Sequence, residues 1–410
     1  MATAKQKISS LDFVGKDAEM TSESIFFLTA CPVTAILTRE LFALTFSGMV
    51  SDDIKNVLAG FAIEGDLVDC IPYGNGHIHD TYAATYTDGD GSRRFIHQRL
   101  NHHVFKDPVG MMRNIVRVCE HLGSKLGSGP QQALEIVKAR NGDTLRRDAD
   151  GYYWRTYVFV ENTEYHDFVQ SPGQAEAAGF AFARFQGMLV DLDANELNET
   201  IPNFHHTPSR MAALESAIAA DTAGRVAQCR DEINFALARK ETVQIVTDGL
   251  ESGEIPVRVT HNDTKINNVL LDVETGAGVC VIDLDTVMAG SLLYDFGELV
   301  RTSTGDFAEN EKDLGKVTLD IERYEALVRG YVGEAKSFLQ PREIELLPHA
   351  GFLMTFENGI RFLADYLNGD TYYKIHYAEE NLDRTHTQFC LVKDIEKKID
   401  QLGAIIDRYV

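Results

Sequence analysis

Short apolar and β-branched segments separated by glycine turns fill the first part of the chain and predict β-strands. The predicted strands cover residues 68–73, 81–86, 94–100, 133–139 and 152–160. A glycine-containing turn at 88–91 precedes the third strand and favours an antiparallel meander. Helices are predicted over 53–61 and 109–122, and Asp107 with Pro108 opens the second of them.

After residue 160 the pattern changes to long helical stretches. Further helices are predicted over residues 174–192, 208–221 (with Thr207 as N-cap) and 230–249. A chain of 410 residues is too long for one ordinary core, so more than one lobe is expected. The predicted division is an N-terminal extension of unknown role (1–50), a β-rich lobe (51–161) and a mostly helical lobe (162–410). This is an α+β chain.

Composition narrows the possible functions. With 39 basic and 62 acidic residues the net charge is −23, which disfavours binding to nucleic acids and to anionic membranes. The six cysteines are scattered without C-x-x-C spacing, so neither a zinc site nor a disulfide framework is expected. The apolar stretch 25–38 is interrupted by Pro32 and is shorter than the roughly 20 residues of a membrane span. We therefore expect a cytoplasmic protein.

The segment 257–285 carries the strongest chemical signal. His261, Asp263 and Asn268 follow the H-x-D-x-x-x-x-N spacing of a kinase catalytic loop. Phosphoryl transfer needs a carboxylate near the attacking oxygen and a separate oxygen ligand for magnesium. Asp263 is therefore the predicted general base and Asn268 a predicted magnesium ligand. A predicted hairpin ends at Asp283, the second predicted magnesium ligand. Each match alone is weak, but the ordered set indicates a kinase that uses ATP and Mg²⁺.

Three other features receive more modest interpretations. Gly74 and Gly76 lie between two predicted strands, where glycines let backbone amides approach phosphate oxygens, although most such turns are simple hairpins. His261 is expected to brace the catalytic loop, and Asp295 to anchor it. The pair His205-His206 lacks partners at metal-ligand spacing and is expected to be solvated or structural rather than a ligand site.

The residues 261–268 with Ile282-Asp283 resemble the aminoglycoside phosphotransferase and choline kinase superfamily, which implies a two-lobed protein-kinase-like fold. Longer segments are similar to the N-acetylhexosamine 1-kinases, which phosphorylate the anomeric hydroxyl of GlcNAc or GalNAc with ATP. These segments are PYGNGHI (72–78), HNDTKINNVL (261–270), VIDLDTVMAGSLLYDFG (281–297), RFLADYLNGDTYY (361–373) and NLDRT (381–385).

The resemblance implies a role for individual residues. Gly74 and Gly76 would lie over the phosphates of ATP. The residues implied to bind the sugar are His77, Asp263, Arg361 and Tyr372. A charged planar donor together with a phenol suits sugar hydroxyls. ATP and a small sugar are the expected partners.

One position departs from the kinase pattern. Gln98 stands where the strand should carry the ATP-binding lysine, so Arg99 or magnesium would have to supply the missing charge. Glu120 lies late for the helix glutamate that usually pairs with that lysine. Two alternatives stay open: a kinase of this fold acting on choline, homoserine, methylthioribose or an aminoglycoside, and a nucleotide-binding pseudokinase. Arg361 argues against cationic substrates, and the retained Asp263 argues against a pseudokinase.

Overall fold

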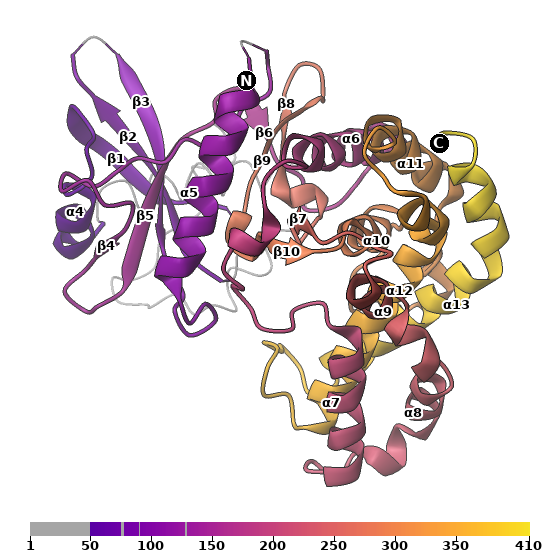
Figure 1. Cartoon of the computed structure of the whole chain (residues 1–410). Helices are drawn as coiled ribbons and strands as arrows, with labels where there is room; N and C mark the ends of the chain where they lie inside the picture. Colours follow the sequence, from indigo (N-terminus) through magenta and orange to yellow (C-terminus); the bar gives the residue numbers. More distant parts are fainter. Residues whose placement is uncertain (1–49, 75–77, 90, 128) are drawn as a thin grey trace, which may run out of the picture.

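The computed structural model describes residues 50–410 except 75–77, 90 and 128, and it consists of a β-rich part followed by a helical part (Figure 1). The strands are β1 (Asp66–Pro72), β2 (Asp80–Thr87), β3 (Ser92–Arg99), β4 (Arg146–Arg147), β5 (Tyr153–Val158), β6 (Thr163–Glu164), β7 (Arg258–Thr260), β8 (Val269–Asp272), β9 (Gly278–Val281) and β10 (Met288–Gly290). The predicted α+β class is confirmed. The extension predicted over 1–50 lies, except for Val50, outside the described residues.

The helices are α4 (Asp52–Leu58), α5 (Pro108–Lys125), α6 (Pro172–Met188), α7 (Thr207–Ala220), α8 (Arg230–Leu237), α9 (Ile245–Ser252), α10 (Leu292–Ser303), α11 (Ile321–Ala335), α12 (Pro341–Leu367) and α13 (Glu380–Ile406). Short 3-10 turns cover Ala194–Glu196, Val226–Gln228, Lys240–Gln244, Ile266–Asn268, Leu284–Thr286 and Leu314–Lys316. No helix of the described residues is long and apolar enough to span a membrane. The lobe boundary at residue 161 stays a prediction.

A five-stranded antiparallel sheet with the order β1-β2-β3-β5-β4 forms the β-rich part. Successive side chains of β3 point to opposite faces, as the pleat requires. Phe95 packs with Leu58 of α4 and with Trp154 on one face, whereas Ile96 packs toward α5 on the other, together with Tyr157. The predicted meander is therefore correct, and α4 and α5 cover the two faces of the sheet (Figure 1).

Local rules set the start of α5. The side chain of Asp107 accepts a hydrogen bond from the backbone N–H of Gly110 (2.9 Å), and Pro108 occupies the first turn, where its missing N–H costs nothing. This start agrees with the sequence prediction. The predicted N-cap of α7 is wrong, because the side chain of His206 accepts from Ser209 N instead, whereas the hydroxyl of Thr207 donates to Glu357.

Two predicted elements are not continuous. The segment 133–139 makes only isolated bridges, such as Ile136 with Tyr157, because β4 pairs with the first residues of β5 along the same edge. The predicted helix 230–249 is divided into α8, a 3-10 turn and α9. Ile233 of α8 and Val246 of α9 belong to different hydrophobic clusters, and one straight helix could not bury both.

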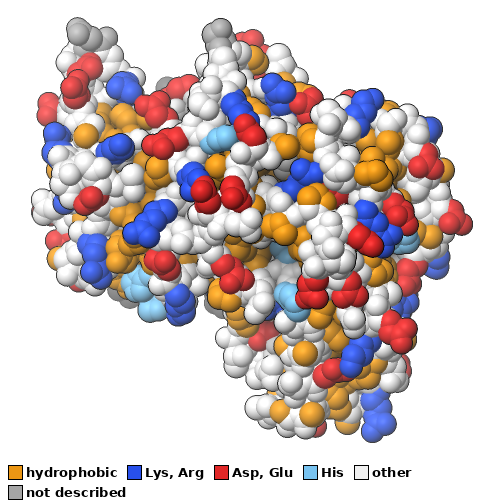
Figure 2. All heavy atoms as spheres, in the orientation of Figure 1, with side chains coloured by type: hydrophobic (Ala, Val, Ile, Leu, Met, Phe, Trp, Pro, Cys, Tyr) orange, Lys and Arg blue, Asp and Glu red, His pale blue; other side chains and the backbone are white. Residues whose placement is uncertain are grey.

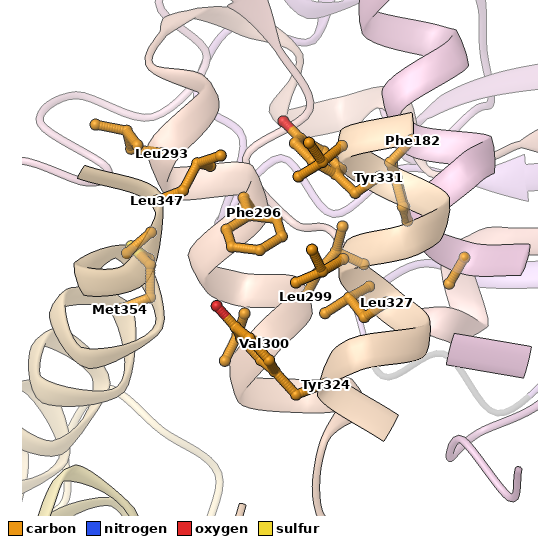
Figure 3. Packing of buried hydrophobic residues seen from close by; sticks show 14 of the residues in the cluster. Phe182, Leu293, Phe296, Leu299, Val300, Tyr324, Leu327, Tyr331, Leu347 and Met354 are labelled. Carbon is orange, nitrogen blue, oxygen red and sulfur yellow. The ribbon is translucent and has the colours of Figure 1, made fainter. Parts of the chain in front are cut away.

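The helical part is built around α10, which lies among α6, α11 and α12 (Figure 3). Its Phe296 is fully buried and faces Tyr331 of α11, with ring centroids 4.8 Å apart. A Cβ on Gly297 would lie 2.3 Å from the carbonyl oxygen of Ala350 on α12, so this close helix contact requires glycine. The dense packing fixes the start of α10, which carries Asp295.

The surface mixes charges of both signs. On the face shown in Figure 2, acidic and basic side chains are interspersed, although the chain as a whole carries a net charge of −23. The five cysteines in the described residues are free thiols, in agreement with the interpretation of scattered, reduced cysteines. That the protein binds no nucleic acid stays a prediction.

Candidate active site

Asp295 of α10 holds the catalytic loop that follows β7. Its carboxylate accepts hydrogen bonds from the backbone N–H groups of His261 (3.0 Å) and Asn262 (2.7 Å) and from the side chain of Gln186 (2.7 Å). Asn262 has φ +64°, a left-handed conformation that costs free energy and persists only where other contacts stabilise it. Asp295 thus anchors the loop, as the sequence predicted.

His261 braces the same loop. Its Nδ1 accepts from the backbone N–H of Asp263 (3.3 Å), and its Nε2 donates to the carbonyl of Ile282 (2.9 Å). This pattern fits one neutral tautomer, in which Nε2 carries the proton. The imidazole therefore ties the loop to the end of β9 and is not placed to accept a proton from a substrate.

Asp263 carries an ionised carboxylate that solvent can reach. Its side chain is 29% exposed, and Oδ2 lies 3.0 Å from Nζ of Lys265 and 3.2 Å from Nδ2 of Asn268. Burial raises the pKa of Asp263, but the positive charge of Lys265 and the hydrogen bonds from Lys265 and Asn268 oppose it, and the net pKa is lowered. Such a carboxylate can orient a hydroxyl group and accept its proton. Lys265 was missed by the sequence prediction, although its position two residues after Asp263 was a usable signal.

Asn268 and Asp283 are brought together by the β8–β9 hairpin. The backbone N–H of Ile282 donates to the carbonyl of Asn268 at 2.9 Å, so Asp283 follows directly beside it. The side-chain amide of Asn268 donates to the backbone carbonyl of Asp263 (2.8 Å), which leaves its Oδ1 outside these hydrogen bonds. Burial and the neighbouring carboxylates Asp285 and Asp263 raise the pKa of Asp283.

These residues fit a magnesium ion. In the described residues no three His, Cys, Asp or Glu side chains are grouped as a metal site. Kinase magnesium sites need fewer protein ligands, because phosphate oxygens and water complete the coordination. Asp283 and Asn268 offer the hard oxygen ligands that magnesium prefers. The crowding of acids that raises the pKa of Asp283 is what a divalent cation would relieve.

Two of the predicted nucleotide residues, Gly74 and Gln98, lie on the β-rich part. Gly74 has φ +79°, and no atom of the described residues lies within 4 Å of the position of a Cβ, so among them its backbone is open to a ligand. Gly76 and His77 lie outside the described residues. Gln98 donates from Nε2 to Thr81 (3.1 Å) and accepts at Oε1 from Nε of Arg155 (2.8 Å). Both ends of Gln98 are therefore engaged within the sheet, and the neighbouring cation is Arg155, which the sequence prediction missed.

Arg361 lies on α12 with little solvent exposure. Its side chain is 13% exposed, and its Nη1 is 4.0 Å from Oε1 of Glu357, beyond hydrogen-bonding distance. The guanidinium is 5.6 Å from the ring centroid of Phe204 and 5.8 Å from that of Tyr373. Arg361 thus sits between aromatic rings with donors available for another molecule.

Tyr372 lies in the loop after α12, as predicted. Asp365 shapes this loop by accepting from the backbone N–H groups of Tyr372 (2.8 Å) and Tyr373 (3.0 Å). The side chain of Tyr372 is 68% exposed, so it can reach a ligand only from the rim. Within the described residues, Oη of Tyr373 and Nε of Arg210 are buried without a hydrogen-bond partner. Neither residue was a sequence prediction.

His205 connects this region to the catalytic loop. Its Nε2 lies 2.8 Å from the carbonyl oxygen of Asn262, and its Nδ1 lies 2.9 Å from Oε1 of Glu357. Both partners accept hydrogen bonds, so both ring nitrogens must donate. Burial alone would lower the pKa of His205, but Glu357 and the Asn262 carbonyl outweigh it and raise the pKa. The sequence left a solvated or a structural role open for His205, and it gave no sign of Glu357.

This arrangement predicts a pH-dependent stability. Because the folded-state pKa of His205 is raised above its unfolded value of about 6.5, its contribution is complete below that pH and is lost as the pH rises through the folded-state pKa. Replacing His205 with Gln is expected to lower the free energy of unfolding by about 3 kcal/mol at pH 6, and less at pH 9. Urea denaturation of both proteins across this range measures the difference.

His386→Gln is the matched control, because His386 pairs with Glu232 at a more exposed position. Its effect should stay below about 1 kcal/mol. A difference between wild type and His205→Gln that grows with increasing pH would contradict the protonated assignment.

Several solved structures resemble this chain in fold. Among solved structures, an aminoglycoside phosphotransferase from Alicyclobacillus acidocaldarius has a TM-score of 0.58 at 13% identity, covering 88% of this chain and 97% of the other. A spectinomycin phosphotransferase in complex with ADP and spectinomycin has a TM-score of 0.54 at 12% identity, covering 86% and 99%. A microcompartment-associated aminopropanol kinase has a TM-score of 0.53 at 16% identity, covering 85% and 98%.

At these identities the structural likeness shows a shared kinase-like fold. The sequence itself gives the family, because the model of the phosphotransferase enzyme family matches residues 69–331, more than half of the 410 residues. The loop with Asp263 and Asn268 and the strand end with Asp283 all lie inside that match. The chain therefore belongs to the phosphotransferase enzyme family.

Proposed function

We propose that this protein transfers the γ-phosphoryl group of ATP to the anomeric C1 hydroxyl of an N-acetylhexosamine, GlcNAc or GalNAc. Membership of the phosphotransferase family supports the reaction class. The observation that carries the choice of acceptor is a pair of buried donor atoms without a hydrogen-bond partner in the described residues, Nε of Arg210 and Oη of Tyr373, together with Arg361, whose contact with Glu357 is 4.0 Å long.

ATP is proposed to lie between the glycine loop and the end of β9. The open backbone of Gly74, with Gly76 two residues later in the sequence, suits phosphate oxygens. Asn268 and Asp283 would hold magnesium, which neutralises charge on the phosphates when it is bound. The triphosphate would then end near Asp263, at the loop where the acceptor is phosphorylated.

Asp263 is proposed to orient the acceptor hydroxyl and to take up its proton. A hemiacetal hydroxyl is more acidic than an ordinary alcohol, so a carboxylate with a lowered pKa suffices. Lys265, held 3.0 Å from that carboxylate, would stabilise negative charge on the transferring group. In such a loose transition state, most of the rate enhancement comes from positioning and charge.

The acceptor would bind where His205 and Glu357 link the catalytic loop to α12. Nε of Arg210 and Oη of Tyr373 are buried without a hydrogen-bond partner in the described residues, and Arg361 makes only a long contact of 4.0 Å with Glu357. Sugar hydroxyls and an acetamido carbonyl supply the matching acceptors. Two arginines close to each other would also disfavour a cationic acceptor.

A second candidate is a kinase for an amine-bearing alcohol. The net charge of −23 would attract cationic substrates, and the structural neighbours include an aminopropanol kinase and an aminoglycoside phosphotransferase. The positive charges of Arg361 and Arg210 argue against this candidate. Their repulsion of a nearby cationic substrate would exceed the attraction from acidic groups on the distant surface.

A panel of acceptors separates the two candidates. We expect ADP release with GlcNAc or GalNAc, and none with choline, kanamycin or 1-amino-2-propanol. Phosphorus NMR of the product should show an anomeric phosphate rather than a C6 ester. Turnover of the amines alone would establish the second candidate. Tight ATP binding without turnover of any acceptor would favour the nucleotide-binding pseudokinase.

Arg361→Met is expected to raise KM for the sugar about tenfold to a hundredfold, because a charged hydrogen bond contributes about 1.5–3 kcal/mol. The KM for ATP should change less than threefold, since Arg361 lies on the acceptor side. Initial rates with each substrate varied measure both constants. Arg239→Met, which removes a surface pair with Glu396, is the control and should leave both unchanged. An unchanged KM for the sugar would remove Arg361 from the site.

A further inference from the structure

Kinases carry a lysine at the strand position where this chain has Gln98. We propose that Arg155 replaces this lysine, and that it acts by holding Asp285 and thereby positioning Asp283. This inference rests on the proposed role of Asp283 as a magnesium ligand. It makes Arg155 a positioning residue, and it gives the departure at Gln98 a physical explanation.

Arg155 lies on β5 directly opposite Gln98 of β3. Its side chain is only 2% exposed, and all three guanidinium nitrogens have partners. Nε donates to Oε1 of Gln98 at 2.8 Å, whereas Nη1 and Nη2 donate to the two carboxylate oxygens of Asp285, the second bond being 3.0 Å long. A bidentate pair of this kind fixes the orientation of both groups.

His79 makes the clamp on Asp285 more rigid. Its Nε2 lies 2.5 Å from Oδ2 of Asp285, and its Nδ1 accepts from the backbone N–H of Asn101 at 3.0 Å. The ring also packs against Phe105, with centroids 5.6 Å apart. Three segments of the β-rich part therefore hold Asp285, which comes from the helical part. His79, before β2, and Arg155 of β5 contact it directly, and Gln98 of β3 acts through Arg155.

Asp285 connects Arg155 and His79 to the segment that carries the catalytic residues. It lies in the 3-10 turn Leu284–Thr286, directly after Asp283, whose φ of +60° is strained for a residue other than glycine. The same turn is tied to the catalytic loop, because Thr286 donates to the carbonyl of His261 (2.7 Å) and accepts at its own carbonyl from Asn262 (2.9 Å). The turn that carries Asp283 is thus fixed from both sides.

A purely structural ion pair explains this less well. Burying two charges seldom stabilises a fold more than apolar side chains of the same volume would. Kinases also need a cation–carboxylate pair in place together with the metal-binding aspartate. The single acidic residue of α5, Glu120, is exposed, so α5 does not supply the buried partner. Asp285 supplies it instead.

The test measures ADP binding by calorimetry in Mg²⁺ and in EDTA, without any acceptor. In wild type, Mg²⁺ should tighten ADP binding. Arg155→Gln is expected to lose about tenfold to a hundredfold of that tightening, because supporting residues of metal sites have effects of this size. Its ADP affinity in EDTA should stay within threefold. An unchanged Mg²⁺ effect, or an equal loss in both conditions, would overturn the proposal.

Two further variants guard against a folding defect. Gln98→Lys added to Arg155→Gln returns a cation to the neighbouring strand and should recover at least half of the lost Mg²⁺ effect on a logarithmic scale; no recovery in a folded protein would count against the proposal. Should Arg155→Gln not fold, Arg155→Lys keeps the charge and should show a smaller loss of the same kind, and an unchanged Mg²⁺ effect in it would overturn the proposal.

Two controls complete the design. Arg94→Gln removes an exposed pair with Glu161 on the same sheet and should change nothing. Asp283→Asn separates the proposed metal-binding role of Asp283 from the positioning role of Arg155, because it should abolish the Mg²⁺ effect even with Arg155 in place. If Asp283→Asn keeps the effect, the metal role in the proposed function fails. If only Arg155→Gln keeps it, the positioning role alone fails.

Discussion

Asp263→Asn is expected to lower kcat about a thousandfold or more, with little change in KM for the sugar or for ATP. Asparagine keeps the shape and can still orient a hydroxyl, but it cannot take up a proton. The loss should therefore appear in kcat, because the carboxylate acts in the transition state more than in substrate binding. Initial rates of ADP release, with sugar binding measured separately by calorimetry, provide both quantities.

Asp272→Asn is a suitable control for this variant, since Asp272 lies at the exposed end of β8 and caps a local turn. It should retain wild-type kcat. Normal turnover by Asp263→Asn would exclude Asp263 as the base, and a loss of sugar binding would indicate a structural rather than a chemical role.

Lys265→Met is expected to lower kcat about a hundredfold to a thousandfold, because it removes the cation closest to Asp263. It should also change the pH profile. Burial raises the pKa of Asp263, and the charge of Lys265 is the strongest effect that lowers it. Removing Lys265 therefore raises that pKa. The acid limb of kcat/KM should move to higher pH, and rates measured between pH 4 and 9 would show it.

Lys265→Arg keeps the positive charge and should retain the position of the acid limb, even if kcat falls through altered geometry. Lys312→Met, which removes an exposed lysine near Asp383, should behave as wild type. A Lys265→Met enzyme with normal kcat and an unmoved acid limb would show that Lys265 only holds Asp263 in place.

The sequence was informative wherever function depends on residues close along the chain. Asp263 and Asn268 are five residues apart, and one tight loop with its hairpin brings Asp283 beside them, so spacing alone predicted their proximity. The roles assigned to them stay predictions. Lys265 carried the same kind of signal but was not used. The helix start at Asp107 was likewise predicted, because capping is a local interaction.

Continuity of elements was less predictable. Residues 230–249 have helical character throughout, yet the chain bends so that Ile233 and Val246 reach separate clusters. The segment 133–139 has the composition of a strand, but β4 occupies part of the edge that it would need. In both cases local preference was real and tertiary packing overrode it.

By itself, the sequence determined the family, the α+β class and the order of the residues at the catalytic loop, because these follow from local patterns along one stretch of chain. Only the tertiary structure decided which distant groups support that loop. Arg155 meets Asp285 across 130 residues, and His205 meets Glu357 across 152. A buried charge needs a partner, and the fold can bring that partner from a distant segment. The spacing of residues along the sequence therefore does not reveal which residue the partner is.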